Sequence, residues 1–442
     1  MNEPPVEPDD PVEPPLSGAE RGPRLLRAFL AVSLDVRLFL GGIALVALYI
    51  LDDAFLQPEA GPSRGGHLVS GTVPVAVLVV CAVAYPRLSV RLRAFLALGL
   101  GVTFVAAGIA VPVRHALAGQ LAGDDFTGLL ATIGGLVVAG VGVVALRRSR
   151  SERKGRSGLV ERSLFGLNVL LVVFWIVLPV VLSFLGTHKG RAHTEVADLG
   201  RPYETVTFAT SDGLKLSGWY VPSRNGAAVI AFPGRKGPVP HARMLARHGY
   251  GVLLFDRRGE GESEGDGNLL GWGGDRDLLA AAAYLDGRPD VRSGRVGGLG
   301  LSVGGELMLE AAARTTALRA VVSEGAGIRS VRELLDMPDA GKWIQLPFQA
   351  TMTAATAVFA NRLPPPNLKS LVAEIAPRPV LLIARPQGQG EELNTIYAAA
   401  GGATTTLWQI KEGGHTGGLS ARPREYERRV VAFFDQALLA PG

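Results

Sequence analysis

Cysteine is nearly absent from this sequence, because Cys81 is the only one among 442 residues. A disulfide within the chain and a cysteine-based metal cluster are therefore both excluded. Cys81 lies inside an apolar run of the first half of the chain. The second half consequently has no thiol that could act as a catalytic nucleophile.

The first residues have few apolar side chains. Residues 1–22 are rich in proline and acidic residues and have no apolar run. Such a segment cannot bury enough surface to offset the entropy of ordering, so we expect a disordered acidic tail. It also has no basic start followed by an apolar stretch, which excludes a secretory signal.

A basic face interleaved with aromatic residues is missing too. The formal net charge is +5, but the basic residues stand mostly in short loops between apolar runs. We therefore expect no nucleic-acid partner and relate the charge to membrane topology.

Long apolar runs are abundant in the first half. A helix crosses the hydrocarbon layer with roughly 20 apolar residues. Residues 23–187 accordingly predict a five-helix transmembrane region. No charged residue lies deep within the runs, which favours a membrane anchor over a transporter. The expected helices cover about Leu38–Leu51, Leu68–Tyr85, Ala94–Val113, Phe126–Leu146 and Leu164–Gly186.

The loops between these runs alternate between many and few basic residues. The segment before the first run is basic, the next loop carries only Arg64, and the loop before the last run, Arg147–Ser163, is the most basic. Because basic loops stay in the cytoplasm, the amino terminus is expected inside. The prediction is a multi-pass protein of the cell membrane whose C-terminal domain is extracytoplasmic, with the lipid bilayer as a partner.

A polar linker over residues 188–202 separates the runs from residues 203–442, where short strands alternate with helices. This alternation predicts a doubly wound α/β domain around a largely parallel sheet. The expected strands are Glu204–Ala209, Leu214–Val221, Ala227–Phe232, Val252–Asp256, Arg295–Leu299, Leu318–Ser323, Pro379–Ala384 and Thr405–Ile410. The expected helices are His241–His248, Asp275–Leu285, Val303–Arg314, Glu391–Ala400 and Arg424–Leu439.

One motif in this domain carries chemistry. Between an expected strand and an expected helix, residues 300–305 read Gly-Leu-Ser-Val-Gly-Gly, a G-x-S-x-G pattern. A serine at such a turn holds its hydroxyl clear of the sheet, so Ser302 is the candidate nucleophile. The N–H of Val303 opens the following helix, where the helix dipole favours a developing negative charge.

The same region permits another interpretation. Gly298 and Gly300 stand at a strand-to-helix turn, and Glu324 follows about twenty residues later, as in a dinucleotide-binding fingerprint. Several expected strands already precede this turn, and this interpretation leaves Ser302 and His415 without a role. We therefore expect no cofactor and no metal ion.

The position of His415 in the sequence makes it the candidate base. Of seven histidines, only His415 comes after Ser302, and it lies between the last expected strand and the last helix among flanking glycines. An imidazole there could take the serine proton during attack and return it to the leaving group.

Together these motifs resemble the α/β-hydrolase superfamily over about residues 203–442. The resemblance rests on the turn at Ser302, on Gly414-His415, and on the stretch Asp256–Ser263, which is similar to the D-x-R-G-x-G-x-S turn of many members. The domain looks most like the dienelactone-hydrolase and serine-peptidase branches, which implies cleavage of esters or peptides without a cofactor.

The resemblance also implies the rest of the site. The backbone N–H groups of Val303 and Arg235 would form the oxyanion hole. The family usually has an aspartate after the penultimate strand, and this loop has none. Glu391 is the first candidate for the acid, with Glu392 and Glu324 as alternatives.

Between Glu324 and Ala373 lies an insertion relative to the minimal sheet. Its stretch Trp343–Ala360 has no charge and several large apolar side chains. This pattern is typical of a lid over an apolar acyl site. A segment of the hydrophobic core would have the same composition.

The sequence thus predicts a membrane-anchored serine hydrolase that acts through an acyl-enzyme on small-molecule or lipid-like esters, or on amides or peptides. Two alternatives remain open at this stage. One is a non-catalytic sensor or scaffold domain on a membrane anchor, and the other is an acyltransferase.

Overall fold

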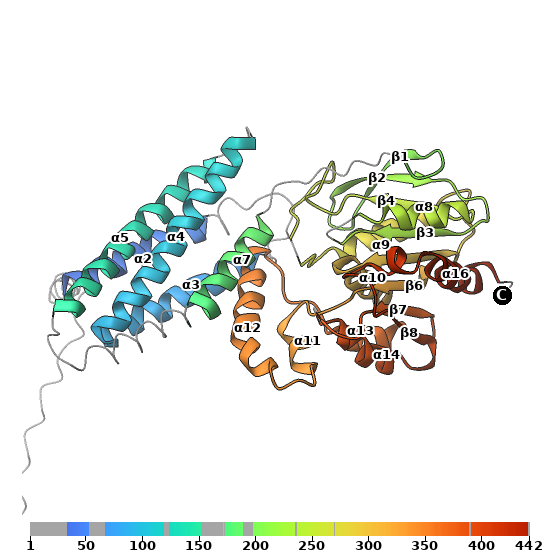
Figure 1. The fold of residues 1–442 in the computed structure, drawn as a ribbon. Helices are drawn as coiled ribbons and strands as arrows, with labels where there is room; N and C mark the ends of the chain where they lie inside the picture. The colour runs from blue at the N-terminus through green and yellow to red at the C-terminus, as the bar shows by residue number, and fades with distance from the viewer. Residues whose placement is uncertain are drawn as a thin grey trace, which may run out of the picture. The chain divides into compact units, whose positions relative to one another are not determined.

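The computed structural model describes residues 33–52, 67–118, 123–151, 171, 173–188, 198–234, 237–268, 270–388 and 390–440. These residues fall into two compact units (Figure 1). The first, here called the helical unit, comprises Met1–Asp52 and Val75–Arg156, and the second, the sheet unit, comprises Asp53–Pro74 and Ser157–Gly442. The expected acidic tail and most of the expected linker lie outside the described residues.

The helical unit is built from α2 (Leu34–Leu51), α4 (Val90–Ala118), α5 (Gly123–Ser151) and most of α3 (His67–Ala84). Small residues let the helices approach closely. A Cβ atom on Gly101 of α4 would lie 2.4 Å from the backbone nitrogen of Ala139 in α5, and one on Gly135 would lie 2.7 Å from that of Val105. Close backbone contact at small residues is the packing mode of helices in lipid.

Large apolar side chains cover the outside of the same helices. Exposed fractions of 40% or more are found on every helix of the unit, for Leu38, Leu48, Val77, Val80, Val83, Leu92, Val102, Leu129, Ile133 and Leu136 among others. A water-soluble helix bundle would present polar residues there.

Two described helices are long and apolar enough to cross a membrane, Leu34–Leu51 and Gly128–Arg147. Two shorter apolar helices cover Gly71–Arg87 and Val173–Thr187. The five-helix transmembrane region therefore stays a prediction.

The sheet unit contains one eight-stranded sheet in the order β1-β2-β4-β3-β5-β6-β7-β8. β1 pairs antiparallel with β2 and β2 with β4, and all other neighbours are parallel. Every residue of β3, β4, β5 and β7 is buried, as expected for central strands covered on both faces. The strands are β1 (Glu204–Ala209), β2 (Lys215–Val221), β3 (Ala228–Phe232), β4 (Gly251–Phe255), β5 (Val296–Leu301), β6 (Leu318–Glu324), β7 (Val380–Ala384) and β8 (Thr405–Gln409).

Helices cover both faces of this sheet. One core cluster lies under α9 (Asp275–Asp286), α10 (Val303–Arg314), α13 (Leu368–Ile375) and α14 (Asn394–Gly401). The other lies under α8 (Val239–Arg247) and α16 (Pro423–Phe434). The mixed sheet with two helical layers is an α/β-hydrolase-like fold, which confirms the predicted fold of residues 203–442.

Two expected helices differ in detail. The expected helix Glu391–Ala400 begins as a 3-10 turn, η4 (Glu391–Leu393), because Gly390 turns the chain with a φ of 79°. The expected closing helix ends its α-helical part at Phe434 and continues as the π-helical turn η6 (Asp435–Leu439).

The uncharged insertion forms α12 (Lys342–Phe359), which follows α11 (Val331–Asp336). Within the sheet unit α12 packs against α7 (Leu178–Thr187), the described end of the last apolar run. Phe359 meets Phe184 edge-on at 5.5 Å, and the Thr356 hydroxyl donates to Ser183 Oγ over 3.1 Å. One face of α7 is thus covered by protein. Whether α12 acts as a lid stays a prediction.

Candidate active site

Ser302 stands at the sharp turn between β5 and α10. Its backbone has φ 54° and ψ −125°, a conformation that non-glycine residues adopt only when the surroundings impose it. The turn is tight enough that a Cβ atom on Gly300 would lie 2.2 Å from the Gly304 carbonyl oxygen. Glycine is therefore required at positions 300 and 304 for this geometry. The turn holds the Ser302 hydroxyl at the carboxyl edge of the sheet.

The structure brings Ser302, His415 and Glu391 together. His415 Nε2 lies 2.7 Å from Ser302 Oγ, and His415 Nδ1 lies 2.9 Å from Glu391 Oε1. The three residues come from the end of β5, the loop after β8 and the turn after β7. This chain of hydrogen bonds can orient an imidazole so that its free nitrogen accepts the serine proton.

Glu391 is held as a carboxylate. Its side chain is 2% exposed, and burial alone would raise its pKa. The hydrogen bond with His415 and the one donated by the Arg385 N–H, over 2.7 Å, outweigh burial and lower the pKa of Glu391 below its usual value. The group is therefore ionised across the physiological pH range.

The other two candidate acids do different things. Glu324, at the end of β6, accepts hydrogen bonds from the Gly418 N–H over 2.8 Å and from the Tyr426 hydroxyl over 2.6 Å. Its backbone carbonyl accepts the Ser302 N–H over 2.7 Å. Glu324 thus links the nucleophile turn to the chain just after His415. Glu392 has a buried Oε2 without a hydrogen-bond partner.

The expected oxyanion donors are only partly described. Val303 is the first residue of α10, directly after Ser302. On the opposite side lies Gly234, which follows β3. A Cβ atom on Gly234 would lie 2.9 Å from Ser302 Cβ. The loop after β3 therefore faces the nucleophile. Arg235, the second expected donor, lies outside the described residues.

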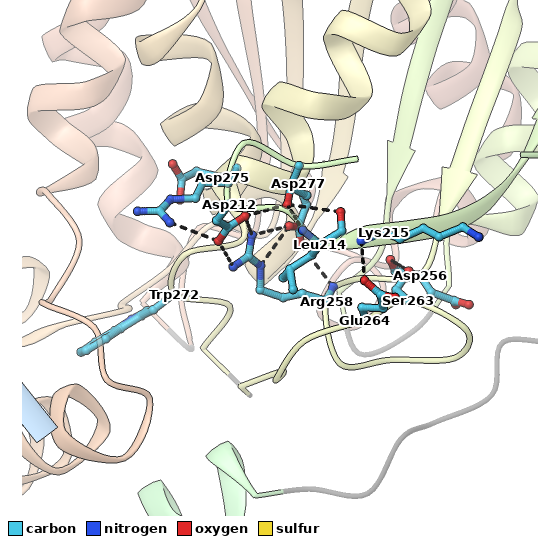
Figure 2. Close-up of polar contacts among 12 residues, drawn as sticks. Asp212, Leu214, Lys215, Asp256, Arg258, Ser263, Glu264, Trp272, Asp275 and Asp277 are labelled. Atoms are coloured by element: carbon cyan, nitrogen blue, oxygen red, sulfur yellow. Dashed lines mark hydrogen bonds and ion pairs between the residues drawn. The ribbon is translucent and has the colours of Figure 1, made fainter. Parts of the chain in front are cut away.

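The turn after β4 is stabilised by buried ion pairs (Figure 2). Arg258, 5% exposed, donates to Asp277 over 2.7 Å and to Asp212 over 3.0 Å. The Ser263 hydroxyl donates to the Asp256 carbonyl over 2.7 Å. Sequence analysis identified this turn only by its resemblance to a family motif, and it missed the carboxylates of Asp212 and Asp277, which lie outside the motif. The sequence offers only their positions as a signal. Asp212 lies at the expected hairpin turn, and Asp277 lies near the start of the expected helix Asp275–Leu285.

Within the described residues, no group of three His, Cys, Asp or Glu side chains could hold a metal ion. The groups that the candidate site brings together are a hydroxyl, an imidazole and a carboxylate.

Comparison with known proteins gives one family match. Residues 187–377 match the X-Pro dipeptidyl-peptidase (S15) family. This match covers less than half of the chain and supports a hydrolase of the esterase or peptidase type.

Individual relatives are more distant. The chain is 25% identical to the protein YfhR of Salmonella typhi over 304 residues, which cover 64% of this chain and 97% of YfhR. It is 28% identical to the thiohydrolase aneE of Aspergillus aculeatus over 194 residues, 41% of this chain and 58% of aneE. Among solved structures, the esterase Pf2001 of Pyrococcus furiosus superposes with a TM-score of 0.45 at 21% identity, covering 56% of this chain and 98% of the esterase.

Proposed function

We propose that this protein is a membrane-anchored serine hydrolase that cleaves esters, or amides or peptides, through an acyl-enzyme. The observation that carries the proposal is the continuous chain from Ser302 Oγ through His415 to Glu391, with distances of 2.7 and 2.9 Å. Both distances are within hydrogen-bond reach, and the first joins the nucleophile to the base that would take its proton.

The reaction follows from this geometry. Ser302 Oγ attacks the substrate carbonyl carbon while its proton passes to His415 Nε2. The tetrahedral intermediate collapses, the bond to the leaving group breaks, and His415 gives its proton to that group. A water molecule then attacks the acyl-enzyme, again with His415 as base, and releases the acid while Ser302 recovers its proton. Glu391 stabilises the imidazolium in both steps.

The negative charge that develops on the carbonyl oxygen needs donors. We assign the Val303 N–H at the start of α10 and, from the resemblance, the Arg235 N–H after β3. Support for Val303 comes from its place at the positive end of the helix dipole. Support for the loop after β3 is the close approach of Gly234 to Ser302.

The membrane anchor is supported by the helical unit. Its outside is apolar and its helices meet at glycines, which suits lipid rather than water. Together with the alternation of basic loops, this supports the proposed five spans, a cytoplasmic amino terminus and an extracytoplasmic hydrolase domain.

A fluorophosphonate probe tests the enzyme directly, because it forms a covalent bond only with an activated serine. We expect the full-length wild type and the Ser420→Ala control, which removes an exposed serine, to be labelled. Ser302→Ala should be unlabelled and lose at least about a thousandfold in kcat/KM. An unlabelled wild type would favour a sensor or scaffold domain instead.

A second candidate is acyl transfer to an acceptor other than water. It is favoured by a match of 35% identity over 120 residues, 25% of this chain and 41% of the relative, to the polyketide transferase grgF of a Penicillium species. The same acyl-enzyme would serve both reactions. Products analysed with and without an added alcohol separate them, since transfer yields a new ester and hydrolysis only the free acid.

A further inference from the structure

An arginine side chain bonds the same carboxylate as the proposed base. Arg385 directly follows β7, and its guanidinium Nε donates to Glu391 Oε1 over 3.2 Å. His415 Nδ1 lies 2.9 Å from the same oxygen. The guanidinium is always charged, whereas an imidazole is charged only when it is protonated. A catalytic triad needs only the bond between acid and imidazole, so the guanidinium is an addition to it.

The position of Glu391 is secured by contacts other than the one with the guanidinium. The backbone N–H of Arg385 donates to Glu391 Oε2 over 2.7 Å. The Glu391 N–H donates to the Gly388 carbonyl over 3.2 Å, and the Asn394 side chain donates to the Glu391 carbonyl over 2.8 Å. All three bonds would remain if another side chain replaced that of Arg385. What the guanidinium adds to Glu391 is therefore mainly its positive charge.

The guanidinium is held against the loop that carries Glu391. A Cβ atom on Gly388, whose φ is 95°, would lie 2.6 Å from Arg385 Nη2. The Arg385 side chain is 28% exposed and that of Glu391 only 2%. Charges that are partly buried are screened by water and salt much less than charges at the surface. The Arg385 charge therefore acts on Glu391, and through it on the imidazole, at short range.

The other titratable groups around the imidazole come from three places. Glu306 on α10 is 7% exposed, and burial raises its pKa, which favours the neutral acid. Glu324 at the end of β6 accepts a backbone N–H of the loop after β8 with its carboxylate. Glu412, within that loop, is paired with Arg422. Arg385 differs from all of these groups because it bonds the carboxylate of the proposed triad itself.

We propose that the Arg385 guanidinium, which shares Glu391 with His415, keeps the imidazole able to act as a base at mildly acidic pH. A carboxylate beside an imidazole stabilises its protonated form, and a nearby positive charge opposes this. His415 beside both groups should therefore lose its proton at a lower pH than beside Glu391 alone. Only the neutral imidazole can take the serine proton. The inference rests on the proposed function and makes Arg385 a positioning residue, since it acts through Glu391.

The test is the pH profile of kcat/KM for a water-soluble ester, measured with the full-length protein. Arg385→Met removes the charge and keeps the backbone N–H that bonds Glu391. Its acid limb should move to higher pH by about half a pH unit to one pH unit. Arg385→Lys keeps a positive charge and should move the limb less. Arg422→Met, which removes an exposed arginine near the same site, is the matched control and should leave the limb at the wild-type pH.

Two results would overturn the inference. If Arg385→Met lowers the plateau but leaves the acid limb in place, Arg385 has a structural role only. If the limb moves to lower pH, the charge acts in the opposite sense. Nuclear magnetic resonance of labelled histidine, assigned with His415→Gln, follows the same protonation without turnover. The His415 midpoint should rise in Arg385→Met, and an unchanged midpoint would contradict us. If the wild type hydrolyses no ester, the proposed function fails, and these midpoints alone decide the effect of Arg385.

Discussion

The helical unit and the sheet unit differ in what they expose and in how their elements make contact. In the sheet unit Phe232, Leu253 and Val321 are fully buried, and buried charges such as Arg258 are paired. In the helical unit glycines make the close contacts, whereas Leu136 is 59% exposed and Val80 66%. The first arrangement suits water and the second suits lipid. All groups of the proposed active site belong to the sheet unit.

The largest effect on kcat is expected at Glu391, which is buried and ionised. Glu391→Gln keeps the size of the side chain but removes the charge that orients His415, so kcat should fall about 10⁴-fold. Glu392→Gln, one residue further, should leave kcat within about twofold. Steady-state rates with a water-soluble ester measure both. Similar losses in the two variants would remove Glu391 from the triad.

Stability should depend on pH through the same carboxylate. The folded state lowers the pKa of Glu391 below its usual 4.5. The unfolded chain therefore takes up this proton first as the pH falls, and the stabilisation present above about pH 4.5 is lost as the pH drops through the folded pKa. Denaturant midpoints between pH 3 and 7 should fall more steeply for the wild type than for Glu391→Gln, whose amide does not titrate. Parallel curves would contradict this.

The paired charges of the sheet unit provide the next effect. Arg258→Met leaves Asp277, which is fully buried, without its partner, and should cost about 3–5 kcal/mol of unfolding free energy. Arg422→Met breaks an exposed pair with Glu412 and should change the unfolding free energy far less. Urea unfolding followed by activity measures both. Equal costs would mean that the turn after β4 does not depend on its ion pairs.

The same substitution in the two units tests the comparison directly. Leu253→Ala empties a fully buried position of β4 and should cost about 2–5 kcal/mol. Leu136→Ala, on the exposed face of α5, should cost less than about 0.5 kcal/mol. Thermal unfolding of the full-length protein, with a separate probe for each unit, gives the two values. A large cost at Leu136 would mean that protein rather than lipid covers this face.

The smallest effect concerns the close contacts of the helical unit. Gly135→Val places its Cβ 2.7 Å from the Val105 nitrogen and should destabilise the unit by about 1–3 kcal/mol. Gly140→Val, in the same helix with nothing within 4 Å, is the matched control and should cost less. Resistance to proteolysis in lipid measures both. No difference between them would argue against packing at glycines.

Two residues of the candidate site can be located from sequence patterns alone. The G-x-S-x-G pattern locates the turn at Ser302, and the position of His415 after the last strand locates the imidazole. Glu391 was less clear, because three glutamates suit the same edge of the sheet and only the register of the chain after β7 places one of them beside His415. Sequence patterns do not predict contacts between segments that lie far apart along the chain. The pairing of α7 with α12 joins residues 169 positions apart in sequence, and the partners of Arg258 lie on separate elements.

Glu324 has a consequence for heat inactivation. This one residue touches the nucleophile turn with its carbonyl oxygen, and with its carboxylate it touches both the loop after His415 and Tyr426 on α16. If α16 detached from the sheet, the distance between the Ser302 hydroxyl and the His415 imidazole would thus increase while the central strands remain paired. On slow warming, turnover should disappear several degrees before the circular-dichroism signal of the sheet.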